Sequence, residues 1–222
     1  MNKAFIFDMD GVIVDSEKAW VKYDNDFLDK LLGKKLAKKI GDTIGVSVRV
    51  IYEKAKALGL EMPREEFQSA YDKTAFSVYD KATITSDIDS LVDFLIKNNF
   101  RLGLVSSSAT SWIGKVLPRM SFADKLESII SLNDRLDLKP KPSPDGYIET
   151  MKNLGSQSSS TIILEDSNSG ITAAKASGAF TIAFTQNLVD GYKQIEGDTK
   201  ADNMEEIIEI IKNNPIIKYA AT

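Results

Sequence analysis

The chain has 222 residues and a formal net charge of −4, which suits one large domain or a core with a small insert and argues against a nucleic-acid-binding or membrane-surface protein. It contains no cysteine and no histidine, which excludes thiolate nucleophiles, disulfides, Ser-His-Asp catalysis and histidine metal sites. Any catalysis must therefore use carboxylates, lysine, hydroxyl groups and a hard metal ion. The apolar start is interrupted by Asp8 and Asp10, unlike a signal peptide, and no apolar run is long enough to span a bilayer, so we expect a cytoplasmic protein.

The first predicted element is a buried strand over residues 4–7, followed directly by Asp8 and Asp10. Four consecutive apolar residues are typical of a strand that is covered on both faces. Side chains two residues apart on a strand point the same way, so the two carboxylates can share one face. They would stay ionised there if a hard divalent cation lay between or beside them. On this stretch alone, a plain polar Asp-x-Asp-Gly turn is an equally good interpretation.

Residues 16–83 are predicted to be entirely helical. Apolar side chains recur every three or four residues in three stretches, which contain Trp20, Ile51 and Phe67. Glycines and Pro63 interrupt the pattern between these stretches. We interpret the whole segment as an all-helical insert.

Beyond residue 86, predicted strands and helices alternate. The strands cover residues 101–105, 128–132, 161–164 and 180–184. Helices are expected near residues 88–95, 112–117, 145–154, 168–177 and 203–213. Alternation of this kind predicts an α/β fold, a Rossmann-like parallel sheet with helices on both faces in three αβα layers. The tail, residues 215–222, has no assignment.

Three of the predicted strands end in polar residues that could form one site. These residues are Asp8 with Asp10, Ser106 with Ser107, and Glu165 with Asp166. Ligands of open parallel sheets bind beyond the carboxyl ends of the strands, so we expect the three groups to converge. Taken singly, the serines also fit an ordinary helix N-cap, and the acids fit a helix N-terminus.

Phosphoryl transfer suits these residues and needs no histidine. Asp8 would attack phosphorus and form an aspartyl-phosphate, while Asp10 would protonate the leaving alcohol and then deprotonate the attacking water. Mg²⁺ held by Asp8 and Asp166 would offset the repulsion between carboxylate and phosphate. The ammonium group of Lys141 would face the phosphoryl oxygens, although a basic, proline-rich surface turn explains the same stretch.

Donors for the phosphate are also predicted at the second strand end. The hydroxyl of Ser106 and the backbone amide of Ser107, at the start of the following helix, would donate hydrogen bonds to phosphate oxygens.

Four motifs occur in this order: Phe7-Asp8-Met9-Asp10-Gly11-Val12, Val105-Ser106-Ser107-Ser108, Lys141-Pro142-Ser143-Pro144-Asp145 and Leu164-Glu165-Asp166-Ser167-Asn168-Ser169-Gly170-Ile171. In content, order and spacing they resemble the haloacid dehalogenase superfamily, in its branch of small-capped phosphatases and β-phosphoglucomutase-like enzymes. The resemblance implies a Rossmann-like core of residues 1–15 and 84–222 and a helical cap of residues 16–83.

The resemblance also implies a role for each matching residue. Asp8 would be the nucleophile and Asp10 the acid/base. Ser106 and Lys141 would bind phosphate, with Lys139 as a less well-matched rival to Lys141. The Mg²⁺ ligands would be Asp8, Asp166 and the carbonyl of Asp10, with Glu165 as a direct or indirect partner of the metal.

The predicted function is that of a Mg²⁺-dependent phosphatase acting on a small, sugar-type phosphorylated metabolite. A phosphosugar mutase is the alternative, and a non-catalytic phosphometabolite-binding module is a third hypothesis. Resembling mutases carry an arginine directly after Gly-Val-Ser and a histidine on the first cap helix. Here Arg49 comes one residue later and Trp20 stands in place of the histidine, which favours hydrolysis. Candidate substrate contacts in the cap are Trp20, Ser47 and Arg49, with Tyr23 and Val46; the sequence predicts no oligomeric state.

Overall fold

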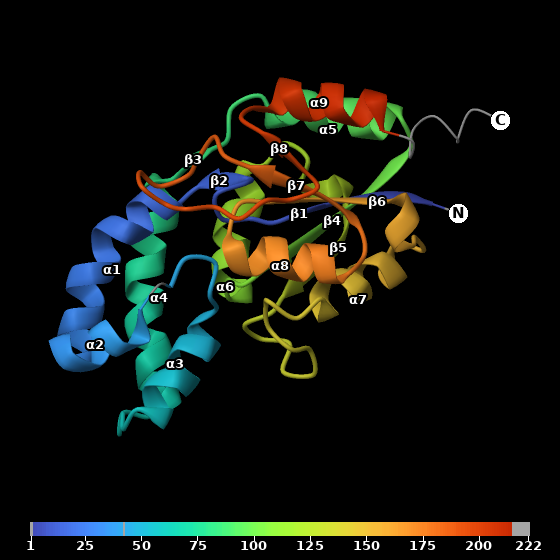
Figure 1. The fold of residues 1–222 in the computed structure, drawn as a ribbon. Helices are drawn as coiled ribbons and strands as arrows, with labels where there is room; N and C mark the ends of the chain where they lie inside the picture. The colour runs from blue at the N-terminus through green and yellow to red at the C-terminus, as the bar shows by residue number, and fades with distance from the viewer. Residues whose placement is uncertain (1, 42, 215–222) are drawn as a thin grey trace.

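The structure, a computed structural model, describes residues 2–41 and 43–214, with the side chains of residues 21–26 outside the description. Its centre is a six-stranded sheet in which every neighbouring pair is parallel, in the order β5-β4-β1-β6-β7-β8 (Figure 1). The strands are β1 (Lys3–Phe7), β4 (Phe100–Ser106), β5 (Leu126–Ser131), β6 (Thr161–Glu165), β7 (Phe180–Phe184) and β8 (Thr199–Ala201). This sheet confirms the predicted Rossmann-like α/β fold.

Helices cover both faces of the sheet, as predicted. The helices α5 (Ile88–Lys97) and α9 (Met204–Asn213) lie over one face, and α7 (Asp145–Asn153) and α8 (Asn168–Ala176) lie over the other (Figure 1). Alternate side chains of β1 fill the two cores, because Phe5 and Phe7 pack in the cluster of α5 and α9, whereas Ala4 and Ile6 pack in that of α7 and α8. The helix α6 (Thr110–Val116) follows β4. None of the helices in the described part of the chain is long and apolar enough to cross a membrane.

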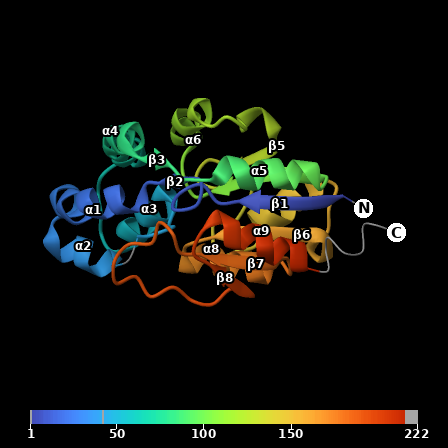
Figure 2. The same ribbon diagram turned by 90° about the horizontal axis from the view of Figure 1, so that it is seen from above.

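The regular structure between β2 (Val14–Asp15) and β3 (Thr83–Ile84) is helical, as the sequence predicts. It consists of α1 (Glu17–Leu32), α2 (Lys34–Ile40), α3 (Val48–Ala57) and α4 (Arg64–Lys81). We call these four helices and their loops the helical insert. Figure 2 shows that it lies beside one end of the sheet. Because β2 and β3 pair antiparallel at the two connections, we propose the division into a core of residues 1–15 and 84–222 and a cap of residues 16–83.

Short elements are the ones that the periodicity did not predict. They are α2, β2, β3, β8 and three 3₁₀ turns at Leu117–Arg119, Ala123–Lys125 and Ser158–Ser160. Two or three residues are too few to show a period, and the Lys-rich α2 has only one buried side chain, Ile40. The unassigned tail, residues 215–222, lies outside the described residues.

Candidate active site

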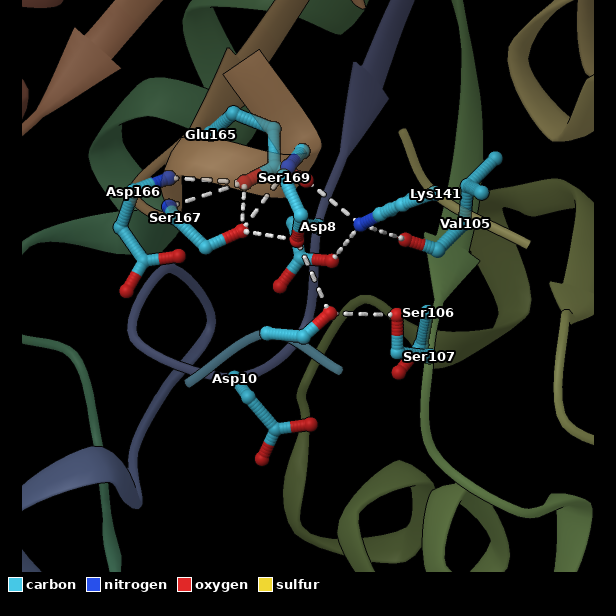
Figure 3. Close-up of polar contacts among 12 residues, drawn as sticks. Asp8, Asp10, Val105, Ser106, Ser107, Lys141, Glu165, Asp166, Ser167 and Ser169 are labelled. Carbon is cyan, nitrogen blue, oxygen red and sulfur yellow. Dashed lines mark hydrogen bonds and ion pairs between the residues drawn. The ribbon is translucent and has the colours of Figure 1, made fainter. Parts of the chain in front are cut away.

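The three polar groups predicted from the sequence meet at the carboxyl edge of the sheet. They lie at the carboxyl ends of β1, β4 and β6, and β1 is paired to both of the others. After β1 the chain moves to β4 on one side and later returns to β6 on the other, which makes this edge the switch point of the sheet. Figure 3 shows Asp8, Ser106 and Glu165 gathered at this point.

Lys141 forms the centre of the site. Its ammonium group donates to Oδ1 of Asp8 and to Oε1 of Glu165, and it lies 3.4 Å from the carbonyl oxygen of Val105 (Figure 3). The side chain is only 2% exposed, whereas Lys139 is at the surface. Burial alone would lower the pKa of Lys141, but attraction to Asp8 and Glu165 raises it well above its ordinary value, so the ammonium stays charged. The structure therefore puts Lys141, and not its rival, in the site.

The ionisation of Asp8 depends on the ammonium group of Lys141. Burial raises the pKa of Asp8 well above its ordinary value, and the charges of Glu165 and Asp10 act in the same direction. Lys141 opposes them and favours the ionised carboxylate.

Glu165 is a buried carboxylate with a full set of donors. Besides Lys141, it accepts hydrogen bonds from Tyr147 Oη at 2.7 Å, from the backbone N–H groups of Asp166 and Ser167 at 3.0 and 3.1 Å, and from Ser167 Oγ at 3.2 Å. These hydrogen bonds hold the carboxylate of Glu165 in place, and Glu165 in turn positions the ammonium group of Lys141. The bonds to Asp166 and Ser167 also close the turn before α8. Tyr147 could not be singled out from the sequence, because its place on α7 fits an ordinary core position.

Asp10 lies in a different environment, among hydroxyl groups. Its Oδ1 accepts from Ser16 Oγ at 2.5 Å and from Tyr79 Oη at 2.8 Å, and its Oδ2 accepts from Ser108 Oγ at 2.7 Å. Tyr79 Oη and Ser108 Oγ also lie 2.9 Å apart, so either hydroxyl can donate to the other in place of Asp10. Burial raises the pKa of Asp10 while the three hydroxyls lower it, and the raised value favours a group that can hold and release a proton.

The acidic residues fit a hard cation. Asp8, Glu165 and Asp166 each have a carboxylate oxygen within 4.8 Å of the others. Oδ2 of Asp166 is buried and has no hydrogen-bond partner among the described residues. Burial raises the pKa of Asp166 well above its ordinary value, and the negative charge of Glu17 raises it further. Oxygen ligands and an unsatisfied buried carboxylate are what Mg²⁺ would require.

Gly11 makes room for this carboxylate. It has a φ of +74°, and a Cβ at this position would lie 1.9 Å from Oδ2 of Asp166. The backbone and the packing therefore both require glycine here.

The two predicted serines have different surroundings. Ser106 is fully buried, and its Oγ accepts a hydrogen bond from the backbone N–H of Ser108 at 3.0 Å. The hydroxyl of Ser107 instead donates to the carbonyl oxygen of Gly45 in the helical insert, at 2.9 Å, and Ser169 Oγ donates to the same oxygen at 3.1 Å. The Gly45 loop is thus bound to the edge of the sheet on both sides of the site.

A cavity of about 60 Å³ lies between the helical insert and this edge. Asp8 and Asp10 line it, together with Glu17, Trp20, Thr43, Ile44, Gly45, Val46, Val48, Ile51, Tyr71, Ser107, Ser108 and Trp112. The predicted contacts Trp20 and Val46 are among these residues.

Ser47 and Arg49, the other substrate candidates, are not among the lining residues and make contacts elsewhere. Ser47 caps α3 by accepting from the N–H of Val50 at 3.4 Å. The guanidinium group of Arg49 donates to the carbonyl oxygens of Arg135 at 3.2 Å and of Leu138 at 3.0 Å. The side chain of Tyr23 lies outside the described residues.

An all-parallel α/β sheet with helices inserted after its first strand and acidic residues at the switch point is the architecture of the haloacid dehalogenase superfamily. The sequence model of this family, described as haloacid dehalogenase-like hydrolase, matches residues 5–184. The chain belongs to this family, which confirms the resemblance seen in its sequence.

Similar proteins include some that are named as phosphatases and one that is named as a mutase. Hexitol phosphatase B of Escherichia coli strain K12 is 26% identical over 177 residues, which cover 78% of this chain and 79% of the relative. The β-phosphoglucomutase of Bacillus subtilis strain 168 is 26% identical over 199 residues, covering 83% and 84%. The crystal structure of β-phosphoglucomutase from Clostridium difficile has the same fold, with a TM-score of 0.75, 22% identity and full coverage of both chains. The chain is therefore an enzyme of the haloacid dehalogenase-like hydrolases, as predicted.

Proposed function

We propose that the chain is a Mg²⁺-dependent phosphatase that hydrolyses a small phosphomonoester of sugar type through an aspartyl-phosphate on Asp8. The observation that carries this proposal is the contrast between two carboxylates that line one cavity. Asp8 is ion-paired with Lys141, whereas Asp10 is surrounded by hydroxyl groups. Two titratable groups in such different environments are suited to separate roles, one as nucleophile and one as acid/base.

In the first step, a carboxylate oxygen of Asp8 attacks phosphorus while the bond from phosphorus to the leaving oxygen breaks. Asp10 gives its proton to that oxygen, so that the product leaves as an alcohol. In the second step, Asp10 takes a proton from water, and the water oxygen attacks phosphorus. Inorganic phosphate leaves, and the carboxylate of Asp8 is restored.

Three predicted phosphate ligands and four predicted metal ligands complete the proposal. Lys141, Ser106 and the amide of Ser107 would bind the phosphoryl oxygens. Mg²⁺ would be held by Asp8, Asp166 and the carbonyl of Asp10. Glu165 would contribute to the metal site indirectly and not as a ligand, because its carboxylate oxygens already accept hydrogen bonds from four other residues. When bound, the metal would stabilise the negative charge of the transferring phosphoryl group.

A phosphosugar mutase is the alternative, and the likeness to the β-phosphoglucomutase of Bacillus subtilis supports it. A mutase acts through a bisphosphate, so it needs a cation for the second phosphate. Arg49 has its guanidinium group on two backbone carbonyls of the core, which favours hydrolysis. A non-catalytic binding module would not need both Asp8 and Asp10. The cytoplasm stays the predicted location, and a small phosphorylated metabolite the predicted partner.

The test is phosphate release from a panel of sugar phosphates and other small phosphomonoesters, with Mg²⁺ and with EDTA, by the wild type and Asp8→Asn. We expect release that requires Mg²⁺ and disappears in Asp8→Asn. Isomerisation of a sugar 1-phosphate, primed by a sugar bisphosphate and without net release, would instead establish the mutase. If neither phosphate release nor isomerisation is detected, the non-catalytic binding module is the remaining hypothesis.

A further inference from the structure

The last turn of α4 is bound by a residue of the core, Arg119. Arg119 ends the 3₁₀ turn Leu117–Arg119, which follows α6, and α6 contacts α4 (Figure 1). Its guanidinium group donates from Nη1 to the carbonyl oxygen of Tyr79 and from Nη2 to that of Ala82. The last carbonyls of a helix have no partner within the helix, and a cation there also suits the helix dipole. Arg119 therefore fixes α4 at the point where the helical insert returns to the core.

Tyr79 is bound at both ends. Its carbonyl oxygen accepts from Arg119, while its buried hydroxyl donates to Oδ1 of Asp10 at 2.8 Å. The ring lies beside those of Trp20 and Trp112, with centroids 6.2 and 6.1 Å away, so that its neighbours confine it sideways. A shift of α4 along its own axis would still move the hydroxyl relative to Asp10. Because helix carbonyls point along the axis, the two hydrogen bonds from Arg119 oppose such a shift.

We propose that Arg119 is a positioning residue that keeps the hydroxyl of Tyr79 within hydrogen-bond distance of Asp10. Arg119 is not one of the residues that line the cavity beside Asp10, so it acts only through Tyr79. The inference rests on the proposed phosphatase function, in which Asp10 gives a proton to the leaving oxygen. Without Arg119, the hydroxyl of Tyr79 is displaced, the carboxyl group of Asp10 is less well oriented, and this proton transfer slows.

The chain offers a matched control for a purely structural role of Arg119. The guanidinium group of Arg101 donates from Nη1 to the carbonyl oxygen of Leu154, the C-cap residue of α7, at 2.6 Å. Arg101→Met thus removes a guanidinium group from the end of a helix, as Arg119→Met does, but leaves α4 and Tyr79 untouched. Arg119 itself is exposed, so water can reach the two carbonyls in the variant, and we expect Arg119→Met to fold.

The experiment compares phenyl phosphate with p-nitrophenyl phosphate at saturating Mg²⁺. The two esters share a ring, but phenolate needs a proton in order to leave far more than p-nitrophenolate does. The ratio of kcat/KM for p-nitrophenyl phosphate to that for phenyl phosphate therefore rises when proton donation by Asp10 is impaired. Arg119→Met should raise this ratio at least about threefold, because catalysis is sensitive to small displacements of the reacting groups. Arg101→Met should leave the ratio unchanged.

A double-mutant cycle shows whether the effect passes through Tyr79. In Tyr79→Phe the hydroxyl is absent, so adding Arg119→Met should change the ratio by less than about twofold. If Arg119→Met does not fold, Arg119→Lys takes its place, since it keeps the charge without the paired N–H groups.

The outcomes separate failure of this inference from failure of the phosphatase proposal. If the wild type releases phosphate from neither ester, the phosphatase proposal is wrong and the inference falls with it. If the wild type hydrolyses both esters, an unchanged ratio in Arg119→Met overturns only the role of Arg119. An equal rise in Arg101→Met, or effects of Arg119→Met and Tyr79→Phe that simply multiply, overturns that role as well.

Discussion

Replacing Lys141 by methionine tests how the charges at the centre of the site are held together. Methionine has a similar length and no charge, so the change removes the ammonium group and keeps much of the volume. Asp8 and Glu165 would then face each other, both buried, without the cation that now contacts both. Removing one partner of a buried ion pair costs about 3–5 kcal/mol of unfolding free energy, because the remaining charge is left uncompensated. We expect a loss in this range for Lys141→Met at pH 8 in the presence of EDTA.

The loss should shrink as the pH falls. Lys141 lowers the pKa of Asp8, so in the variant this pKa rises further above its ordinary value. A carboxyl group whose pKa is higher in the folded than in the unfolded protein binds protons more tightly when folded. Stability therefore increases as the pH falls from the folded pKa towards the unfolded value of about 3.9. Relative to the wild type, the variant should thus recover part of its loss between pH 8 and pH 5.

Urea unfolding followed by tryptophan fluorescence measures this difference, since Trp20 and Trp112 lie in the cluster between the helical insert and the core. Lys139→Met is the matched control, because it removes the same charge from an exposed position in the same loop. It should change stability by less than about 0.5 kcal/mol and should still release phosphate. Equal stability of the two variants at pH 8, or a loss in Lys141→Met that is the same at pH 5 and pH 8, would refute the reasoning.

Two further predictions concern the carboxylates on either side of this centre. Gly11→Ala should abolish the rise in thermal unfolding temperature that we expect Mg²⁺ to give the wild type, because its Cβ would overlap the carboxylate of Asp166, a proposed metal ligand. Gly33→Ala is its control: it also replaces a glycine of positive φ, +77°, but among the described residues beyond its chain neighbours no atom lies within 4 Å of the added Cβ, so the response to Mg²⁺ should remain. Tyr79→Phe removes a hydrogen bond to Asp10 and should lower kcat for phosphate release by about tenfold, since a bond to a charged group is worth about 1.5–3 kcal/mol. Tyr52→Phe, which loses a hydrogen bond to a backbone carbonyl, should keep the wild-type kcat; equal rates in the two tyrosine variants would show that the Asp10 contact has no part in the reaction.

The sequence predicts the sheet and the position of the site because both depend on local patterns. Four apolar residues followed by Asp8 and Asp10 indicate a buried strand that ends in charge, and the pattern recurs before Glu165 and Asp166. In a parallel sheet such ends meet at one edge, so the convergence of these residues follows from topology alone. The confirmed fold rests on this reasoning.

Partners that come from distant parts of the chain could not be predicted in this way. Tyr79 is separated from Asp10 by 69 residues and occupies a helical position that fits a core side chain. Arginine is usually exposed, yet the guanidinium group of Arg49 donates to the carbonyl oxygens of residues that lie 86 and 89 positions later in the chain. The periodicity of apolar residues gives no sign of such a contact. Such contacts depend on how the helical insert lies against the sheet, and this placement is a tertiary property.

The hydrogen bonds of Asp10 link its chemistry to the position of the helical insert. Ser16 precedes α1 and Tyr79 lies near the end of α4, so two of the three hydroxyl donors to Asp10 belong to the segment at the two connections of the insert. Only the third donor, Ser108, comes from the sheet side. A movement of α4 away from the sheet would remove the Tyr79 donor and would also separate Tyr79 from Ser108. Asp10 therefore has its complete environment only when the insert lies against the carboxyl edge of the sheet. In the proposed mechanism, closure of the insert over a substrate and positioning of the proton donor would then be one event.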